Sequence, residues 1–305
     1  MRIGTLSIDF MAARQICLLL SLAAITCSIT VLAINGLDYG LDFTGGSLVE
    51  LEFASEPVLE TVRETLSNAG FKDAVVQAFG APTDVVIRIA QDDAPKAGDE
   101  IFAALQASSF EVELLRSEFV GSVVGEELRE QGGLGLLLAL GIVMLYVAFR
   151  FQFKFSIGAV VALVHDVLIV LGIFAVFDLD FDLTVLAAVL AVIGYSLNDS
   201  IVVSDRIREN FRIMRTKDPV KVINDSINQT LSRTLATSTT TLLVLFAILM
   251  FGGELIHNFA LALTIGVAVG TYSSIYVVPI ALLMMKISRD DLLVPEKEED
   301  IDARP

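Results

Sequence analysis

The sequence predicts a polytopic α-helical membrane protein with one small α+β domain outside the membrane. Hydrophobic residues make up 54% of the 305-residue chain, which is too apolar for a soluble protein of this size. Six apolar runs are each long enough to cross a hydrocarbon core of about 30 Å. The expected transmembrane helices are residues 15–34, 133–149, 155–177, 183–203, 235–251 and 259–285.

The connections between these runs alternate in charge. The basic set contains Arg2, Arg14, Arg150, Lys154, Arg206, Arg208, Arg212, Arg215, Lys217, Lys221, Lys286 and Arg289. The acidic set contains the long segment 35–132, Asp178, Asp180, Asp182 and Glu254. Lys and Arg are enriched in cytoplasmic loops, so we expect both termini, residues 1–14 and 286–305, to be cytoplasmic. The same rule places the connection 204–234 in the cytoplasm and residues 35–132 outside.

Residues 35–132 are expected to fold as a small domain with the order βαββαβ, which is that of a ferredoxin-like unit. Its strands and helices are expected, in order, at residues 47–53, 57–70, 74–79, 84–89, 95–107 and 110–115. The segment holds 19 acidic and 6 basic residues, a net charge of −13, which excludes nucleic-acid binding. It has no His or Cys, so we interpret its carboxylates as a solvated face rather than a catalytic or metal site.

Asp199 lies inside the fourth apolar run, about five residues or ~7 Å from its inner end, with Asn198 beside it. An ionised carboxylate in hydrocarbon costs several kcal/mol, so an intramembrane Asp indicates a functional residue by default. The alternative is that Asn198 and Asp199 only join neighbouring helices by hydrogen bonds.

Arg233 stands at the start of the fifth run. The Asp218-Pro219 pair predicts a helix start, with Asp as N-cap and Pro in the first turn, followed by an amphipathic helix along the cytoplasmic surface. This helix delivers Arg233 to the membrane edge. Two interpretations stay open: Arg233 reaches Asp199 and sets its charge, or it is an ordinary positive-inside anchor.

His165 and Asp166 fall near the middle of the third run. Neighbouring residues on a helix project about 100° apart, so we do not expect both side chains to face the same partner. They are interpreted either as a proton relay or as a polar contact between helices. A metal site is not expected, because the only other histidine is His257 on the external side.

Two further features concern backbone geometry. Asp42, Thr44, Gly45 and Gly46 follow the first run, and the paired glycines suit a tight turn or a close approach of backbones. The sixth run carries small residues that permit close helix packing and a proline that predicts a kink. These residues are Gly266, Gly270, Ser273, Ser274 and Pro279.

Sequence motifs over nearly the whole chain carry a family resemblance. They are Gly40-Leu41-Asp42-Phe43-Thr44-Gly45-Gly46, Val164-His165-Asp166, residues 194–210, Ser232-Arg233-Thr234, Phe251-Gly252-Gly253 and residues 270–277. Together they resemble the SecF family, the smaller membrane subunits of bacterial SecD–SecF protein-export complexes. The architecture is similar to half of a resistance-nodulation-division transporter. The string at 194–210 is the most specific of these motifs, and the glycine turn alone is much weaker.

The resemblance implies a function. Members of this family work with SecD beside the SecYEG channel, together with YajC, in the bacterial inner membrane. They are thought to use the proton-motive force to assist translocation and release of secreted preproteins, without cofactor, metal or enzymatic activity. By position, Asp199 matches the family's proton-coupling carboxylate and Arg233 its membrane arginine. Asp42, Thr44, Gly45 and Gly46 match its external signature.

Two rival classes are compatible with parts of the sequence. A related transporter exporting lipid or drug would usually carry two such halves in one chain, and the 194–210 string argues against it. An intramembrane aspartyl protease would use Asp166 and Asp199 as a dyad. Their expected depths differ, whereas a dyad needs contact at about 3 Å.

Overall fold

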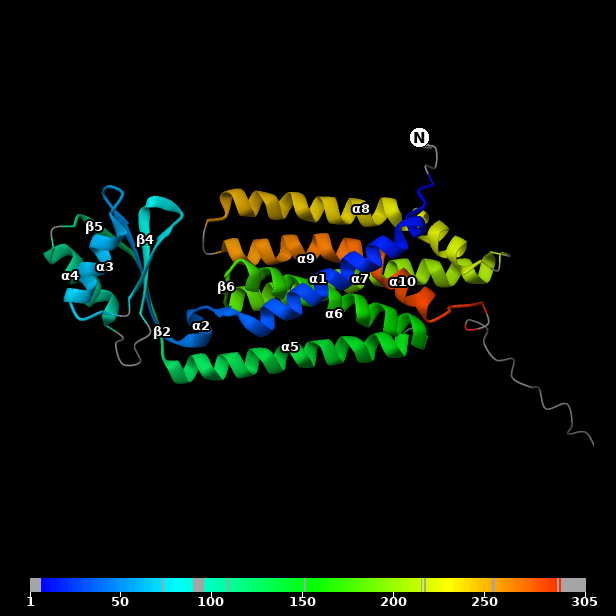
Figure 1. The fold of residues 1–305 in the computed structure, drawn as a ribbon, viewed down its shortest axis with the longest axis horizontal. Coiled ribbons are helices and arrows are strands. Elements are labelled where there is room, and N and C mark those ends of the chain that lie inside the picture. The colour runs from blue at the N-terminus through cyan, green and yellow to red at the C-terminus, as the bar shows by residue number, and fades with distance from the viewer. Residues whose placement is uncertain are drawn as a thin grey trace, which may run out of the picture.

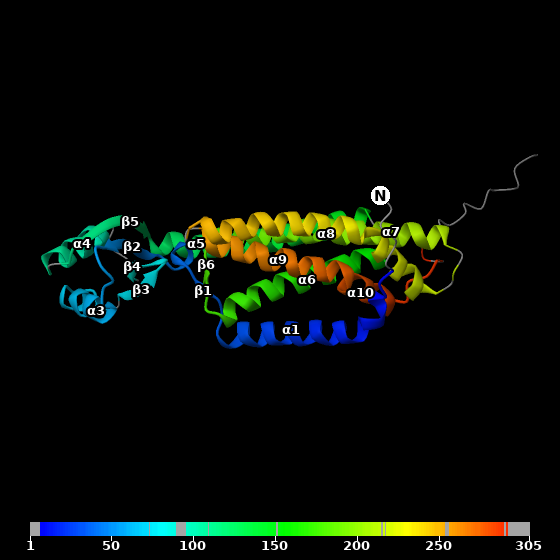
Figure 2. The same cartoon turned by 90° about the horizontal axis from the view of Figure 1, so that it is seen from above.

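In the computed structural model, a helical bundle carries a small sheet domain at one end (Figures 1 and 2). The structure describes residues 7–72, 74–89, 96–108, 110–150, 152–214, 216, 218–253, 256–289 and 291. Within these residues, six helices are long and apolar enough to cross a membrane, which confirms the expected number. They are α1 (Arg14–Ile34), α5 (Ser122–Arg150), α6 (Phe153–Val176), α7 (Leu183–Ile213), α8 (Pro219–Phe251) and α9 (His257–Ile275) with α10 (Val277–Met284).

The connections lie at the two ends of the bundle as the alternation of charge predicts. The short 3-10 helix η1 (Phe10–Ala13) before α1 lies at the end far from the sheet domain, as do the α5–α6 and α7–α8 connections and α10 (Figure 1). The α6–α7 connection lies at the sheet-domain end, where α8 ends and α9 begins. Basic and acidic connections are therefore separated by the length of the bundle.

The connection expected at 204–234 is mostly helix. Helix α7 continues to Ile213 and α8 begins at Pro219, so the residues between the two helices are few. Asp218 caps α8, since its Oδ1 accepts a hydrogen bond from the Val220 amide at 3.0 Å, and this confirms the expected helix start. The amphipathic segment is not a separate surface helix, because no Gly or Pro follows Pro219 before Phe251 to end it.

The sixth membrane helix is broken near its proline. Helix α9 ends at Ile275, Tyr276 has φ −119° and ψ −49°, and α10 follows. Pro279 has no amide hydrogen for the Ile275 carbonyl four residues earlier, so the expected kink is confirmed with its cause. Close packing is confirmed as well: a Cβ on Gly266 would come within 2.1 Å of the Val192 side chain on α7.

The sheet domain has the expected order of six elements. These are β2 (Gly46–Phe53), α3 (Leu59–Asn68), β3 (Val75–Phe79), β4 (Ala81–Ile89), α4 (Ala97–Ala107) and β5 (Val112–Val120). The strand order is β3-β4-β2-β5, with antiparallel neighbours throughout. Val49, Leu51 and Phe53 alternate into a core under the two helices. Strand β5 extends past the expected end at residue 115, because it pairs with β2 as far as Gly46.

An ion pair joins the sheet domain to the bundle. Arg88 on β4 binds Asp180 in a two-pronged contact, with Nη1 to Oδ1 at 2.8 Å and a second bond between Nη2 and Oδ2. Asp180 belongs to β6 (Asp180–Phe181), which pairs in parallel with β1 (Asp38–Tyr39). The hydrogen bond to Asp180 raises the pKa of Arg88 above its ordinary value. Neither two-residue strand was expected from the sequence.

We expect Arg88→Gln to loosen the contact between the sheet domain and the bundle. A charge-assisted pair at a half-buried site contributes about 1 kcal/mol, so opening should increase about fivefold. Hydrogen exchange at β1 and β6 in the full chain measures this. Arg63→Gln is a matched control, because Arg63 pairs with the exposed Glu60 within the sheet domain. Equal exchange in both variants would contradict the assignment.

Candidate functional site

Asp199 is buried within the bundle, with 3% of its surface exposed. It lies on α7, which packs mainly against α9, α8 and α6. Among the described residues, its Oδ2 has no hydrogen-bond partner. Ser200 and Ser204 on the same helix and Thr234 on α8 also carry buried hydroxyls without partners. Buried polar atoms are normally satisfied, so each of these unpartnered groups could bind a proton or a water molecule.

Arg233 is on the neighbouring helix α8 and is exposed. Its guanidinium lies close enough to act electrostatically on Asp199, as does the hydroxyl of Thr234. Neither makes a regular contact: no ion pair within 4.0 Å joins Arg233 to Asp199 in the described part of the chain, and Thr234 Oγ1 is outside hydrogen-bonding geometry. The pair is thus adjacent but unbound.

A cavity of about 280 Å³ opens beside Arg233. Its lining includes Asp205, Arg206, Gln229 and Thr230 from α7 and α8. This places the guanidinium at a polar opening near the end of the bundle that lies far from the sheet domain. An arginine there can turn toward Asp199 or toward water without leaving its helix.

Among the described residues, no hydrogen bond joins Asn198 to another helix. Its side chain is exposed on α7, whereas Asp199 beside it is buried. Successive residues turn by about 100° on a helix, so the two project in different directions. The contact or relay role expected for Asn198 therefore stays a prediction.

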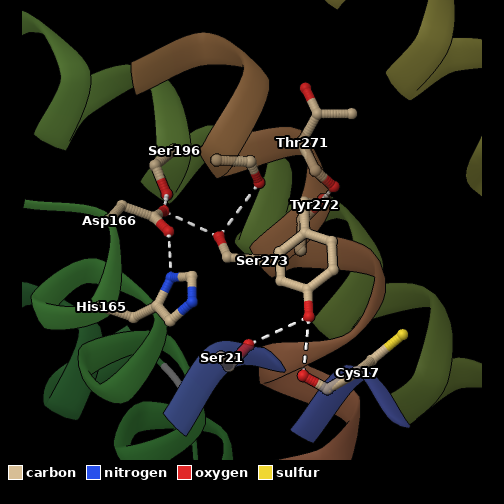
Figure 3. A network of polar contacts seen from close by, with 10 residues as sticks. Cys17, Ser21, His165, Asp166, Ser196, Thr271, Tyr272 and Ser273 are labelled. Atoms are coloured by element: carbon tan, nitrogen blue, oxygen red, sulfur yellow. Dashed lines mark hydrogen bonds and ion pairs between the residues drawn. The ribbon is translucent and has the colours of Figure 1, made fainter. Parts of the chain in front are cut away.

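His165 and Asp166 contact each other directly (Figure 3). His165 Nδ1 lies 2.8 Å from Asp166 Oδ1, and both side chains are buried. Asp166 Oδ2 accepts hydrogen bonds from the hydroxyls of Ser196 on α7 and Ser273 on α9, the latter at 2.7 Å. Flexible side chains of adjacent residues can bend toward one point even though their Cα–Cβ bonds diverge. The partners of the Asp166 carboxylate do not include Asp199, which is contrary to a protease dyad.

A second set of contacts runs from this network to α1 (Figure 3). The His165 ring stacks on Tyr272 with ring centroids 6.0 Å apart. The Tyr272 hydroxyl donates to the Cys17 carbonyl at 2.8 Å and lies 3.0 Å from Ser21 Oγ. These contacts anchor the peripheral helix α1 to the centre of the bundle.

The glycine turn joins α1, the sheet and α5. Asp42 Oδ2 accepts from the Leu183 amide at 3.0 Å and so caps α7. Thr44 Oγ1 donates to the Gly40 carbonyl at 3.1 Å. Gly45 has φ +72°, and a Cβ there would come 2.6 Å from Ser122 Cα at the start of α5. Gly46, with φ +119°, begins β2. The turn therefore needs glycine for its conformation and for its close packing.

Sequence reasoning missed the partners of these residues. Ser196 lies in the 194–210 string and Ser273 among the small residues of the sixth run, but nothing in the sequence connects either with Asp166. Arg88 and Asp180 were counted only as charges of their segments. Among the described residues, no group of three His, Cys, Asp or Glu side chains is placed to hold a metal ion.

Comparison with known proteins gives consistent matches. Residues 100–288 match the family described as "Protein export membrane protein SecD/SecF, C-terminal", and residues 30–56 match the "SecD/SecF GG Motif". The chain is 49% identical to the protein translocase subunit SecF of Pseudomonas aeruginosa, over 100% of this chain and 99% of that protein. It is 46% identical to SecF of Vibrio alginolyticus, over 96% and 95% of the two chains.

A solved structure shares the fold. The crystal structure of SecDF from Thermus thermophilus, described as a translocon-associated membrane protein, superposes with a TM-score of 0.86 at 38% identity. The match covers 94% of this chain and 40% of that one. The chain agrees with these relatives in sequence, in domain order and in fold over almost its full length. The chain therefore belongs to the SecF family of SecD/SecF protein-export membrane proteins.

Proposed function

We propose that this translocase subunit works with SecD and uses the proton-motive force to assist translocation and release of secreted proteins across the bacterial inner membrane. The observation that carries the proposal is Asp199: a buried carboxyl group on a membrane helix, with one oxygen unpartnered among the described residues and an exposed arginine nearby. Such a group can bind a proton from one side and release it to the other as access changes.

Arg233 supplies the link between charge and helix position. When the guanidinium approaches Asp199, the ionised carboxylate is stabilised; when it turns away toward the cavity, the protonated form is favoured. Movement of α8 against α7 then accompanies each proton. One charge crossing about 100 mV provides ~2.3 kcal/mol, so a large stroke requires several protons.

The partners follow from the family. The match to SecDF covers 40% of that protein, and its name joins SecD to SecF, which supports SecD as the partner subunit of this chain. By family membership we extend the proposal to the SecYEG channel, YajC and translocating preproteins. The chain then acts as an auxiliary subunit, not as an enzyme.

The sheet domain is proposed to be a ferredoxin-like domain on the periplasmic side. Its element order and antiparallel strand order support that assignment. The positive-inside rule then places both termini and the 204–234 segment in the cytoplasm. The membrane-crossing parts are proposed to be the six apolar runs, while the longer helices extend beyond them.

A transporter for lipid or drug is the second candidate in the same architecture. Copurification distinguishes the two: pull-down of the tagged chain should recover SecD and channel subunits as its membrane partners. Recovery of a small substrate without these partners would favour the transporter.

Labelling on whole cells tests the orientation. We replace Cys17 and Cys27 by Ser and then introduce Ser108→Cys or Thr216→Cys separately. An impermeant thiol reagent should label the Ser108→Cys chain and leave the Thr216→Cys chain unlabelled until the cells are opened. The opposite pattern would reverse the proposed topology.

Removal of the titratable charge tests the proton site. Asp199→Asn keeps the shape of the side chain, so the complex should assemble while proton-driven export in vesicles falls. The loss reaches about 50-fold at ~100 mV if one proton drives the limiting step. Asp205→Asn, an exposed position near the end of the same helix, is the matched control and should be much milder. Full export in Asp199→Asn would exclude the coupling role.

A double-variant comparison tests whether Arg233 acts through Asp199. If the two form one unit, losses in Arg233→Met and Asp199→Asn should not add in the double variant. Arg233→Lys keeps the charge but loses the planar fork, so its export rate should be intermediate. The rates are compared at equal membrane levels. A fully active Lys variant with additive losses in the double variant would leave Arg233 as a topology anchor.

A further inference from the structure

The cluster around Asp166 is the most deeply buried ionisable group of the described bundle. Asp166 has 0% and His165 1% of its surface exposed. The hydrogen-bond partners of Asp166 come from three helices: His165 from α6, Ser196 from α7 and Ser273 from α9 (Figure 3). The proton coupling proposed for Asp199 does not use this cluster.

The hydrogen bonds at Asp166 can be completed in two ways. In the ionised form, Oδ2 accepts from both serine hydroxyls and Oδ1 accepts from His165 Nδ1–H. Ser273 Oγ also lies 3.1 Å from the Gly270 carbonyl of its own helix. In the protonated form, Oδ2–H can donate to Ser273 Oγ while the Ser273 hydrogen turns to Gly270. Both patterns satisfy every group named with the heavy atoms in place.

The apolar surroundings favour a proton held within the cluster. A lone carboxylate so deeply buried is expensive, and the described residues show no Lys or Arg in contact with Asp166. The charge is balanced either by a proton on Asp166 or by one on His165. The His165 Nε2 atom is buried and has no partner in the described structure. It has no partner in either arrangement, so it is the ring atom left to accept a proton.

We propose that His165, Asp166, Ser196 and Ser273 form a second internal proton-binding site of the bundle. The proton resides on Asp166 or His165 and exchanges through His165 Nε2. Its arrival or departure changes the bonds that hold α6 to α7 and α9. Ser196 is one helical turn from Asp199, so the site lies next to the proposed coupling residue on the same helix. Only its role in export rests on the proposed function of Asp199; proton binding itself does not.

The other ionisable groups near the pair are few. Helix α1 contributes Cys17, whose carbonyl binds Tyr272 of α9, and α7 contributes Asp199. On α5 the apolar part carries Tyr146, which is 53% exposed, and α10 carries no ionisable residue. Tyr276, at the break after α9, lies against Tyr272. Apart from Cys17, the buried ionisable side chains of the described bundle are His165, Asp166 and Asp199.

Infrared difference spectroscopy distinguishes Asp166 from Asp199. The full chain is reconstituted with SecD in lipid vesicles, and spectra are recorded at acidic and at basic pH. The difference spectrum shows the C=O stretching band of protonated carboxyl groups. We expect one band that is lost in Asp166→Asn and retained in Asp199→Asn. The same band should shift in Ser273→Ala, since the acceptor of the acid proton is removed. His165→Gln should also shift the band, since the hydrogen-bond partner of Asp166 Oδ1 is changed.

Asp205→Asn serves as the control, because its exposed carboxyl group should contribute nothing to a buried band. Ser273→Ala keeps the test valid if Asp166→Asn does not assemble, since the hydroxyl is removed without creating a buried amide. If the wild-type band is unchanged in Ser273→Ala and in every Asp166 variant that assembles, the cluster is a fixed polar contact and the proposal is wrong. Full proton-driven export in Asp199→Asn would refute the proposed coupling and leave the Asp166 band as it is.

Discussion

The burial of two carboxyl groups in an apolar bundle is the constraint on which the arrangement of α6, α7, α8 and α9 depends. Each isolated ionised group would cost several kcal/mol, so the surrounding helices must offer donors, protons or water. Asp166 receives them from its neighbour His165 and from serines on α7 and α9. Asp199 has no such set among the described residues, and the α8 residues that act on its charge there are Arg233 and Thr234. Asp166 is thus held by hydrogen bonds from three residues, whereas Asp199 Oδ2 has no partner among the described residues.

Small residues make this close arrangement possible. Gly266 lets α9 approach Val192 on α7, and Gly270 places α9 against Ser196. The same approach brings Ser273 within reach of Asp166. Close packing and the polar contacts therefore depend on each other. A larger side chain at Gly266 would separate α7 from α9, and Ser196 and Ser273 could then no longer both reach Asp166. Movement of α7 would therefore change the surroundings of both Asp166 and Asp199.

The sheet domain is attached to the bundle directly. A single residue, Gly121, separates the end of β5 from the start of α5, and the glycine turn packs on the first residue of that helix. The Arg88–Asp180 pair and the β1–β6 pairing add a second attachment at the α6–α7 connection. Asp42 caps α7, the helix that carries Asp199, from the same turn. A displacement of α7 can thus be transmitted to the sheet domain through these direct contacts.

The sequence by itself determined the six membrane helices, the alternation of their connections and the order of elements in the sheet domain, because these depend on local composition and periodicity. It also singled out Asp199, His165 and Asp166, since a charge within an apolar run is visible without a structure. Only the tertiary structure decided the partners: Ser196 and Ser273 stand 30 and 107 residues from Asp166, and Arg88 stands 92 residues from Asp180. It also turned Asn198 outward and merged the amphipathic segment with α8. A periodic pattern predicts that a side chain is buried, whereas the packing of helices distant in sequence determines which residues it contacts.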